Sequence, residues 1–304
     1  MTAGMRLRLM VTGASGQVGW ELIRSLAPLG DVIAVDRGRM NLAEPDAIRS
    51  AIREIRPDVL INPAAWTAVD LAESETDAAA AVNAVAPGVM ATECRKLDAL
   101  FVHYSTDFVF DGCRTMPWSE DDATGPLNAY GKTKLAGEVA VRESGARHLI
   151  LRTSWVYSLR GSNFLRTMVR LAQRHDSLRV VDDQFGAPTS AMALADLTAQ
   201  MVGRHFAAEH FRGLQGIYHA SCAGRTSWHG FATAILEALV ARPAQREAFR
   251  LERLPSIRAI PASEYPLPAR RPANSQLSLE KLHRHWGLTM PDWQAALDCV
   301  LRDA

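Results

Sequence analysis

The sequence predicts an α/β fold, a doubly wound parallel sheet with a smaller C-terminal α/β lobe. Over the first 155 of its 304 residues, short apolar runs alternate with amphipathic segments of helical period. The apolar runs are nearly continuous, which is typical of strands buried on both faces of a parallel sheet. Beyond about residue 157 the alternation becomes irregular, which indicates a second, smaller unit.

Each element of the first half follows from a local pattern. Short apolar runs predict strands, and apolar residues three and four positions apart predict helices. Pro28 and Gly30 end the first helix, and the Pro87–Gly88 pair breaks the third. The predicted strands are residues 6–13, 31–36, 58–65, 99–106 and 148–157, and the predicted helices are residues 17–30, 45–57, 73–98 and 130–143.

The second half contains fewer strands, and some of its elements are expected to return to the sheet. We therefore expect residues 1–156, rejoined by roughly 186–212, to form one unit, and residues 157–185 with 213–304 to form a smaller lobe. The predicted elements are helices at 162–175, 190–210 and 227–240, strands at 177–183 and 216–221, and a proline-rich run at 255–272.

The composition makes several classes of protein improbable. A net charge of +1 gives no field that would favour nucleic acid or an anionic membrane as a partner. The sequence has no run of about 18 apolar residues, so no segment is expected to span a membrane, and its N-terminal apolar stretch is too short for a secretory signal. The four cysteines lie far apart and form no CxxC, which is typical of reduced thiols in the cytoplasm.

A glycine pattern between the first strand and the first helix predicts a dinucleotide site in a Rossmann-type sheet. Gly13 permits the tight turn, Gly16 lets the backbone approach a pyrophosphate, and Gly19 lets the helix pack on the strand. The free N–H groups of the helix N-terminus face the phosphates. Asp36, which ends the next strand, can accept hydrogen bonds from the adenosine ribose. The alternative is a glycine turn without a ligand.

The residue after Asp36 leaves the choice of cofactor open. Asp36 repels a 2′-phosphate and so favours NADH, whereas Arg37 can pair with that phosphate and so favours NADPH. We therefore expect tolerance of both. Residues 1–156 are then a dinucleotide-binding domain, and the smaller lobe is expected to hold the substrate.

Tyr130 and Lys134 are four positions apart on a predicted helix, so they share a face, whereas Lys132 points elsewhere. Reduction of a ketone by hydride transfer makes an alkoxide, which needs a proton. A phenol with a pKa of about 10 donates or accepts protons poorly near neutrality, and an ammonium within about 5 Å is expected to lower that pKa by about two units at most. The alternative is an exposed helix with a solvated lysine.

Thr106 supplies a hydroxyl at the end of the strand over residues 99–106. Ligands of open parallel sheets bind outside the carboxyl ends of the strands, so Thr106 can polarise a substrate carbonyl or hold its oxygen against Tyr130. The alternative is a hydroxyl that satisfies backbone groups. His103, in the same strand, is expected to be a satisfied strand residue rather than a catalyst.

Seven segments spread over nearly the whole chain carry a family resemblance. The chain resembles the extended short-chain dehydrogenase/reductase superfamily and, within it, the dTDP-4-dehydrorhamnose reductases. The resemblance implies reduction of dTDP-4-dehydro-L-rhamnose to dTDP-L-rhamnose, with a hydride from NADPH or NADH and a proton from Tyr130. The segments are GASGQVGWEL, RPDVLINPAAWTAVDLAE, HYSTDFVFDG, PLNAYGKTKLAGE, LRTSWVY, DDQFGAPTS and ARRPANSQL.

The resemblance also implies roles for single residues. Tyr130, Lys134 and Thr106 form the catalytic set, Thr106 and Asp107 contact the deoxysugar, and Trp155 packs on it. Trp155 is alternatively an ordinary core aromatic. The cofactor-binding residues from motif and resemblance together are Gly13, Gly16, Gln17, Val18, Gly19, Asp36, Asn41, Leu42, Ala65, Trp66, Thr67, Tyr104, Tyr130 and Lys134.

Four positions qualify the resemblance. Pro63 stands where the family usually has alanine and removes no side-chain chemistry, and Asn41 stands where the family often has aspartate. Some members form a magnesium-linked homodimer through acidic residues. Glu21 fits one such position, but Met192 stands where another acidic ligand is expected. No metal ligand is assigned here, and the need for Mg²⁺ and a homodimer are left open.

Two other functions fit the same fold. A nucleotide-sugar epimerase or dehydratase recycles bound NAD and so consumes no added NADPH. A non-catalytic, cofactor-binding regulatory subunit is the second alternative. The intact set of Thr106, Tyr130 and Lys134 favours the reductase.

Overall fold

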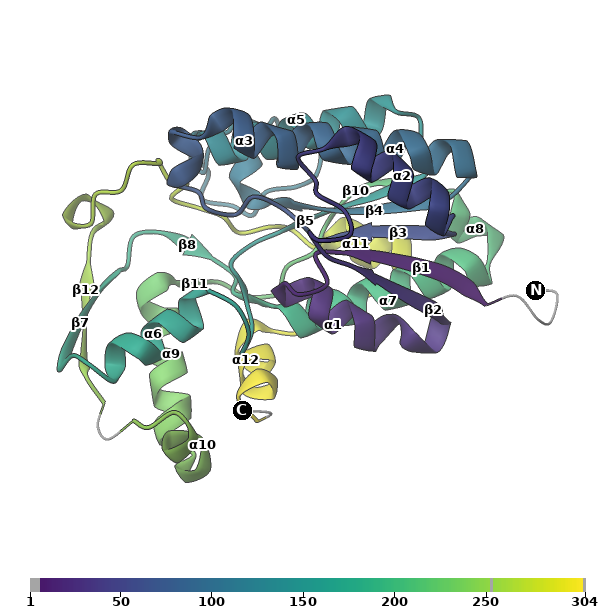
Figure 1. The fold of residues 1–304 in the computed structure, drawn as a ribbon. Helices are drawn as coiled ribbons and strands as arrows, with labels where there is room; N and C mark the ends of the chain where they lie inside the picture. The colour runs from purple at the N-terminus through teal and green to yellow at the C-terminus, as the bar shows by residue number, and fades with distance from the viewer. Residues whose placement is uncertain (1–5, 252–253, 303–304) are drawn as a thin grey trace.

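The computed structural model describes residues 6–251 and 254–302, and its centre is a six-stranded parallel sheet (Figure 1). The strand order is β10-β5-β4-β3-β1-β2. From β1 the chain adds β2 on one side and the later strands on the other, and sheets of this kind bind ligands at this switch point between β1 and β3. The predicted doubly wound fold is confirmed. The strands are β1 (Leu7–Thr12), β2 (Gly30–Val35), β3 (Val59–Asn62), β4 (Leu100–Thr106), β5 (His148–Thr153) and β10 (Gly216–His219).

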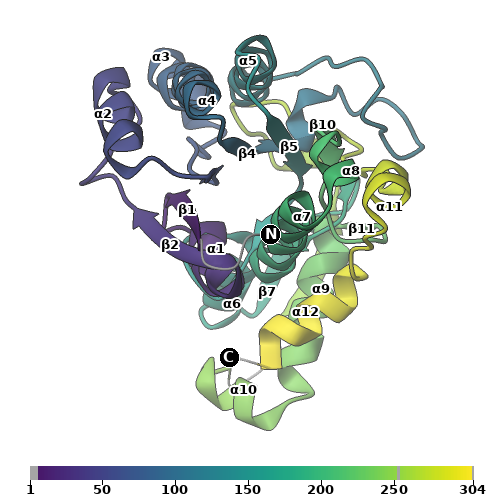
Figure 2. The same cartoon turned by 90° about the vertical axis from the view of Figure 1, so that its right-hand side faces the viewer.

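Helices cover both faces of this sheet (Figures 1 and 2). On one face α1 (Gln17–Leu26) packs against α7 (Ala191–Ala207). On the other, α4 (Ala86–Leu97) lies between α2 (Pro45–Ile55) and α5 (Ala129–Glu143). Successive strand residues point to opposite faces, so each strand contributes side chains to two separate apolar clusters.

The long helix predicted over residues 73–98 is interrupted just before Pro87 rather than at it. Helix α3 (Thr76–Ala80) leads into a π-helical turn, Ala81–Val85, before α4 begins. Proline has no N–H and its ring clashes with the carbonyl four residues earlier, that of Asn83, so the turn widens. From this turn Asn83 holds the loop that contains Trp66. The side-chain amide of Asn83 accepts the backbone N–H of Trp66 (2.9 Å) and donates to the backbone carbonyl of Trp66 (3.1 Å).

The single strand predicted over residues 148–157 is wrong in its second half. The chain leaves the sheet after Thr153 and resumes as β6 (Val156–Tyr157), which pairs with β9 (Thr189–Ser190) instead. Trp155, which lies between β5 and β6, has a φ of +50°, a region that residues with a Cβ rarely adopt. Its indole stacks on Trp228 with ring centres 3.6 Å apart, and this contact offsets part of the backbone strain.

The smaller lobe has an apolar core of its own. Helices α6 (Phe164–Ala172), α9 (Trp228–Val240) and α12 (Trp293–Arg302) bury this core beside a two-stranded ribbon of β7 (Ser177–Val181) and β12 (Ser256–Ile260) (Figure 1). The sequence pattern predicts α6, α9 and β7 but neither α12 nor β12.

The proposed division of the chain into residues 1–156 with 186–212, and 157–185 with 213–304, stays a prediction. Two elements of the second part contact the sheet: β10 pairs with β5, and α11 (Glu280–Trp286) packs on the same apolar cluster as α1. Among residues 6–251 and 254–302, no helix has the length and apolarity that crossing a membrane requires.

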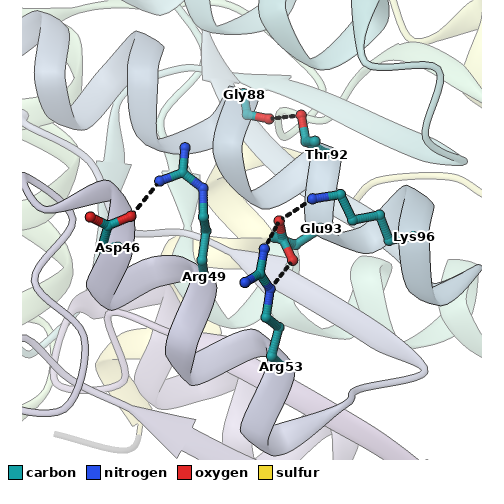
Figure 3. Close-up of polar contacts among 7 residues, drawn as sticks. All are labelled: Asp46, Arg49, Arg53, Gly88, Thr92, Glu93 and Lys96. Atoms are coloured by element: carbon teal, nitrogen blue, oxygen red, sulfur yellow. Dashed lines mark hydrogen bonds and ion pairs between the residues drawn. The ribbon is translucent and has the colours of Figure 1, made fainter.

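A carboxylate on α4 binds two cations at the contact between α2 and α4 (Figure 3). Glu93 accepts two hydrogen bonds from Arg53, at 2.8 and 3.0 Å, and one from Lys96, at 2.6 Å. The hydrogen bond from Arg53, followed by that from Lys96, lowers the pKa of Glu93 to about 2 against the opposing effect of burial. The side chains of Arg53 and Lys96 remain 58% and 55% exposed, so both cations keep contact with water.

His205 of α7 makes folding stability sensitive to acid. Its ring is buried, and burial lowers its pKa to about 4, with the guanidinium groups of Arg147 and Arg212 adding to the effect. In the unfolded chain this histidine becomes protonated as the pH falls below about 6.5. In the folded chain it becomes protonated only near pH 4. Stability falls as the pH is lowered through this window, by about 1.4 kcal/mol per pH unit.

We expect His205→Phe to flatten the pH dependence of folding. Between pH 7.5 and pH 5 the wild type should lose about 2 kcal/mol more of its unfolding free energy than the variant, because only the wild type carries this proton linkage. Urea unfolding at both pH values, followed by circular dichroism, measures the difference. Parallel losses in the two proteins would contradict the assignment, whatever the absolute stability of the variant.

Candidate functional site

The glycine loop has the geometry that an anion-binding helix start requires. Gly13 has a φ of +55°, and a Cβ on Gly19 would lie 2.1 Å from the carbonyl oxygen of Gly13, so neither position accepts a larger residue without a shift. Helix α1 begins at Gln17, and Gly16 offers no side-chain cap. The first N–H groups of α1 are therefore left for a ligand such as a pyrophosphate.

Two adjoining cavities extend from this loop and share Gly13, Ser15, Ala64 and Ala65. One, of about 360 Å³, is lined by the predicted adenosine-side residues Asp36, Asn41, Leu42, Ala65 and Trp66, with Arg37 beside them. The other, of about 470 Å³, is lined by the remaining predicted cofactor residues, namely Gly13, Gly16, Gln17, Val18, Gly19, Ala65, Thr67, Tyr104, Tyr130 and Lys134.

The cavities fit the two halves of a nicotinamide dinucleotide. Asp36 stands at the end of β2 in a turn in which its Oδ1 accepts the backbone N–H groups of Gly38 (3.0 Å) and Arg39 (3.2 Å). Its second carboxylate oxygen is free of these bonds and can accept from ribose hydroxyls. The glycine loop joins this cavity to the one that contains Tyr130 and Lys134, so a dinucleotide would reach both.

Helix α5 presents Tyr130 and Lys134 to the second cavity. The helix begins where Asn128 caps it, with Oδ1 accepting the N–H of Gly131 at 2.8 Å. A Cβ on Gly131 would lie 2.2 Å from the carbonyl oxygen of Phe108, so only glycine lets the helix start this close to the end of β4. Lys134 is 2% exposed, whereas Lys132 is exposed, which confirms that the two lysines point in different directions.

The pKa values of this pair differ from the sequence-based expectation. Burial raises the pKa of Tyr130 to about 12, although the hydrogen bond with Thr106 opposes it, and burial lowers the pKa of Lys134 to about 8. The expected lowering of the Tyr130 pKa by Lys134 is therefore wrong, because burial raises that pKa and the Asp107 carboxylate adds to the rise. The ammonium donates instead to the carbonyl oxygen of Tyr104 at 2.6 Å.

Thr106 and Asp107 lie at the carboxyl end of β4, buried beside Tyr130. The Thr106 hydroxyl donates to Asp107 Oδ1 at 2.9 Å and accepts the N–H of Phe108 at 3.2 Å. Burial raises the pKa of Asp107 to about 6, although hydrogen bonds from Ser275 and Thr106 oppose it. Thr106 thus satisfies a backbone N–H, which was the alternative to a catalytic role, and it also contacts Tyr130, the predicted proton donor.

A third cavity, of about 320 Å³, opens between the strand ends and the smaller lobe. Trp155 lines it together with Trp228, on which it stacks. Arg271 enters from the segment 261–272 and is held by Asp70 through two bonds of 3.0 and 2.7 Å. Trp228 could not be recognised from the sequence, because only the fold brings it against Trp155.

The loop between β6 and α6 closes over the glycine loop, which sequence reasoning missed. The Gln17 side chain accepts hydrogen bonds from Asn163 Nδ2 (2.8 Å) and from the Ser158 hydroxyl (3.1 Å). Gly161 and Ser162 consequently line the cavity of Tyr130. The sequence signal that could have indicated this loop is a glycine two residues before a helix cap. Gly161 has a φ of +67°, and Asn163 caps α6.

The donor set near Glu21 does not fit a metal ion. Arg24 lies between Glu21 (3.5 Å) and Asp196 (3.2 Å), so a guanidinium already neutralises both carboxylates. In the part of the chain that the structure describes, no three His, Cys, Asp or Glu residues are placed to hold a metal.

Comparisons with known proteins identify the family. The family profile described as RmlD substrate binding domain matches residues 6–304. A dTDP-4-dehydrorhamnose reductase from Burkholderia thailandensis is 48% identical over 300 residues, which cover 98% of this chain and 99% of that protein. The enzyme of the same name from Escherichia coli strain K12 is 44% identical over 301 residues, 98% of both chains.

Solved structures are similar over the same length. The crystal structure of dTDP-4-dehydrorhamnose reductase from Bacillus anthracis in complex with NADP has a TM-score of 0.88 and 31% identity, and covers 99% of this chain and 100% of that one. UDP-glucose 4-epimerase from Thermus thermophilus, with a TM-score of 0.77 and 18% identity over 97% of this chain and 98% of its own, shares the fold alone. The chain therefore belongs to the dTDP-4-dehydrorhamnose reductase family, as its sequence motifs predict.

Proposed function

We propose that the protein reduces dTDP-4-dehydro-L-rhamnose to dTDP-L-rhamnose with NADPH or NADH. The observation that carries the proposal is the position of Tyr130 and Lys134 in the cavity that begins at the glycine loop. A bound reduced nicotinamide supplies the hydride, and the chain must then supply a proton, an oxygen-binding hydroxyl and a means of excluding water.

The proton and the hydroxyl each have a residue. Tyr130 gives its phenolic proton to the oxygen that forms at the sugar C4, and Thr106, its hydrogen-bond partner, holds that oxygen in place. The pKa of Tyr130, about 12 in the buried site, keeps the phenol protonated at neutral pH. Lys134 places a positive charge under the same cavity and holds the nicotinamide ribose, and Asp107 contacts the deoxysugar.

The third cavity suits the nucleotide end of the substrate. Aromatic side chains, including Trp155 and Trp228, give it an apolar surface for a sugar face or a base. Arg179 and Arg271, which are ion-paired with Glu264 and Asp70, line it and supply hydrogen-bond donors for a diphosphate. This division of roles places the sugar C4 between Trp155 and Tyr130.

Both cofactors are expected to support turnover, because Asp36 and Arg37 line the same cavity and favour different ribose groups. Mg²⁺ is expected to be dispensable, since Arg24 occupies the place between the nearby carboxylates. We place the reaction in the cytoplasm, where the chain's widely spaced cysteines stay reduced. A homodimer is compatible with this proposal but not required by it.

One assay tests the proposal. Purified protein is mixed with NADPH or, in parallel, NADH, and the absorbance of the reduced nicotinamide is followed after adding dTDP-4-dehydro-L-rhamnose. We expect consumption with both cofactors, unchanged by EDTA, and dTDP-L-rhamnose as the product. Product formation from a nucleotide sugar without cofactor consumption would instead identify an epimerase or dehydratase. Cofactor binding without any turnover would identify a regulatory subunit.

A further inference from the structure

His103 lies in the middle of β4, directly beneath Lys134, and none of the roles above uses it. Its ring is fully buried and lines neither cofactor cavity. Nε2 lies 3.4 Å from Lys134 Nζ, and Nδ1 lies 3.2 Å from Asn62 Nδ2. The imidazole therefore connects the end of β3 with the lysine of the site.

The orientation of Asn62 determines which nitrogen of His103 carries the proton. Asn62 Oδ1 accepts from the Thr12 hydroxyl at 2.6 Å, and the amide nitrogen of Asn62 faces His103. An amide nitrogen only donates, so His103 Nδ1 must accept. A neutral imidazole has one N–H, which is then on Nε2 and points at Lys134.

This arrangement disfavours the ammonium form of Lys134. An ammonium has three donors and no acceptor, so it cannot accept the Nε2–H of His103, whereas a neutral amine can. The separation of 3.4 Å exceeds an ordinary N–H hydrogen bond, as expected for two donors that face each other. A hydrogen bond made only by the neutral form shifts a group towards that form.

The other charged groups around Lys134 do not cancel this effect. Glu138 lies one turn further along α5 and favours the ammonium, but Arg152 of β5 binds both of its oxygens, at 2.9 and 2.7 Å. From β4, only the Tyr104 carbonyl accepts from Nζ. Tyr130 shares the cavity and is neutral near pH 7, and Asp107 acts on Tyr130 rather than on Lys134.

We propose that His103, oriented by Thr12 and Asn62, is a positioning residue that presents its Nε2–H to Lys134 and so weakens the lysine's hold on its proton. This rests on the proposed reductase function, because the consequence appears in the pH dependence of turnover. Turnover should decline at alkaline pH when Lys134 loses the charge that supports Tyr130. His103 sets where that decline begins.

The test is the pH profile of kcat for His103→Phe with saturating NADPH and sugar substrate. Phenylalanine keeps a flat buried ring, stacked near Phe101, but removes the N–H. We expect the alkaline limb to move up by roughly half to one pH unit. The matched control is His205→Phe, another buried histidine with no contact to Lys134, whose alkaline limb should not move. An unmoved limb in His103→Phe overturns the proposal, and so does a downward shift, which would mean that His103 accepts a hydrogen bond from the ammonium.

A second measurement uses the wild-type protein without substrate, so it depends neither on turnover nor on the folding of a variant. Long-range ¹H–¹⁵N spectra of the wild-type protein distinguish the two imidazole tautomers, and we expect His103 to carry its proton on Nε2 between pH 6 and 8. A proton on Nδ1 would refute the proposed orientation. Failure of the wild type to turn over the sugar would count against the reductase function alone, since the tautomer is read without substrate.

Discussion

Replacing Tyr130 by phenylalanine is expected to lower kcat by a factor of roughly 10²–10⁴ while cofactor affinity stays close to that of the wild type. The phenol lines the cavity that begins at the glycine loop and is hydrogen-bonded to Thr106, so its loss removes the proton that the proposed reaction needs. The ring itself packs edge-on against Phe108 with centres 5.7 Å apart, and phenylalanine keeps this contact. Steady-state kinetics and a separate titration with NADPH measure the two effects.

Tyr157 provides the matched control for this substitution. Its ring is fully buried in the lobe, and its hydroxyl has no hydrogen-bond partner in the described part of the chain. Tyr157→Phe therefore removes the same atom without removing an interaction, and kcat should not change. Near-normal turnover in Tyr130→Phe would show that the proton comes from elsewhere, and an equal loss in both variants would point to a general effect of the missing hydroxyl.

Replacing Glu138 by glutamine is expected to destabilise the fold by about 3–5 kcal/mol, because it leaves a buried guanidinium without its counter-charge. The side chains of Arg152 and Glu138 are only 3% and 1% exposed. Glu138 also accepts from the Ser105 hydroxyl, so one carboxylate joins β4, β5 and α5. Arg152 Nη1 has no partner in the described residues, so the cation has no alternative acceptor ready. Urea unfolding at pH 7.5 measures the loss.

Glu93→Gln is the matched comparison for Glu138→Gln. Glu93 binds its cations with similar geometry, but Arg53 and Lys96 reach water and can turn outward once the charge is gone (Figure 3). We expect a loss of about 1–2 kcal/mol. Similar losses in the two variants would mean that burial of the partner cation does not decide the cost.

The sequence predicts most of the sheet because buried parallel strands leave a simple signature. The runs predicted over residues 6–13, 58–65 and 99–106 all became strands, and these strands end near the site at Thr12, Asn62 and Thr106. The break at Trp155 has no such signature, because its positive φ depends on a tryptophan seventy-three residues later in the chain. A pattern confined to neighbouring positions cannot report that contact.

The candidate site, like the sheet, could be predicted only in part from the sequence. Spacing alone placed Tyr130 and Lys134 on one face of a helix, since the helical period is local. The direction of their pKa shifts was not predictable, because it depends on how completely other segments desolvate them. The acceptor of Lys134, the Tyr104 carbonyl of β4, and the orientation of His103 by Asn62 are likewise results of strand pairing rather than of sequence spacing.

The late arrival of β10 and α11 affects how the chain folds during synthesis. When residue 156 has been made, the strands that bind the cofactor all exist, yet β5 is still an open edge, and the face of the sheet under α1 lacks α7 and the side chain of Trp286. An open edge with uncovered apolar residues invites pairing with other chains. The cofactor half therefore cannot finish folding ahead of the lobe, and a product truncated near residue 156 would be prone to aggregate rather than act as a binding module.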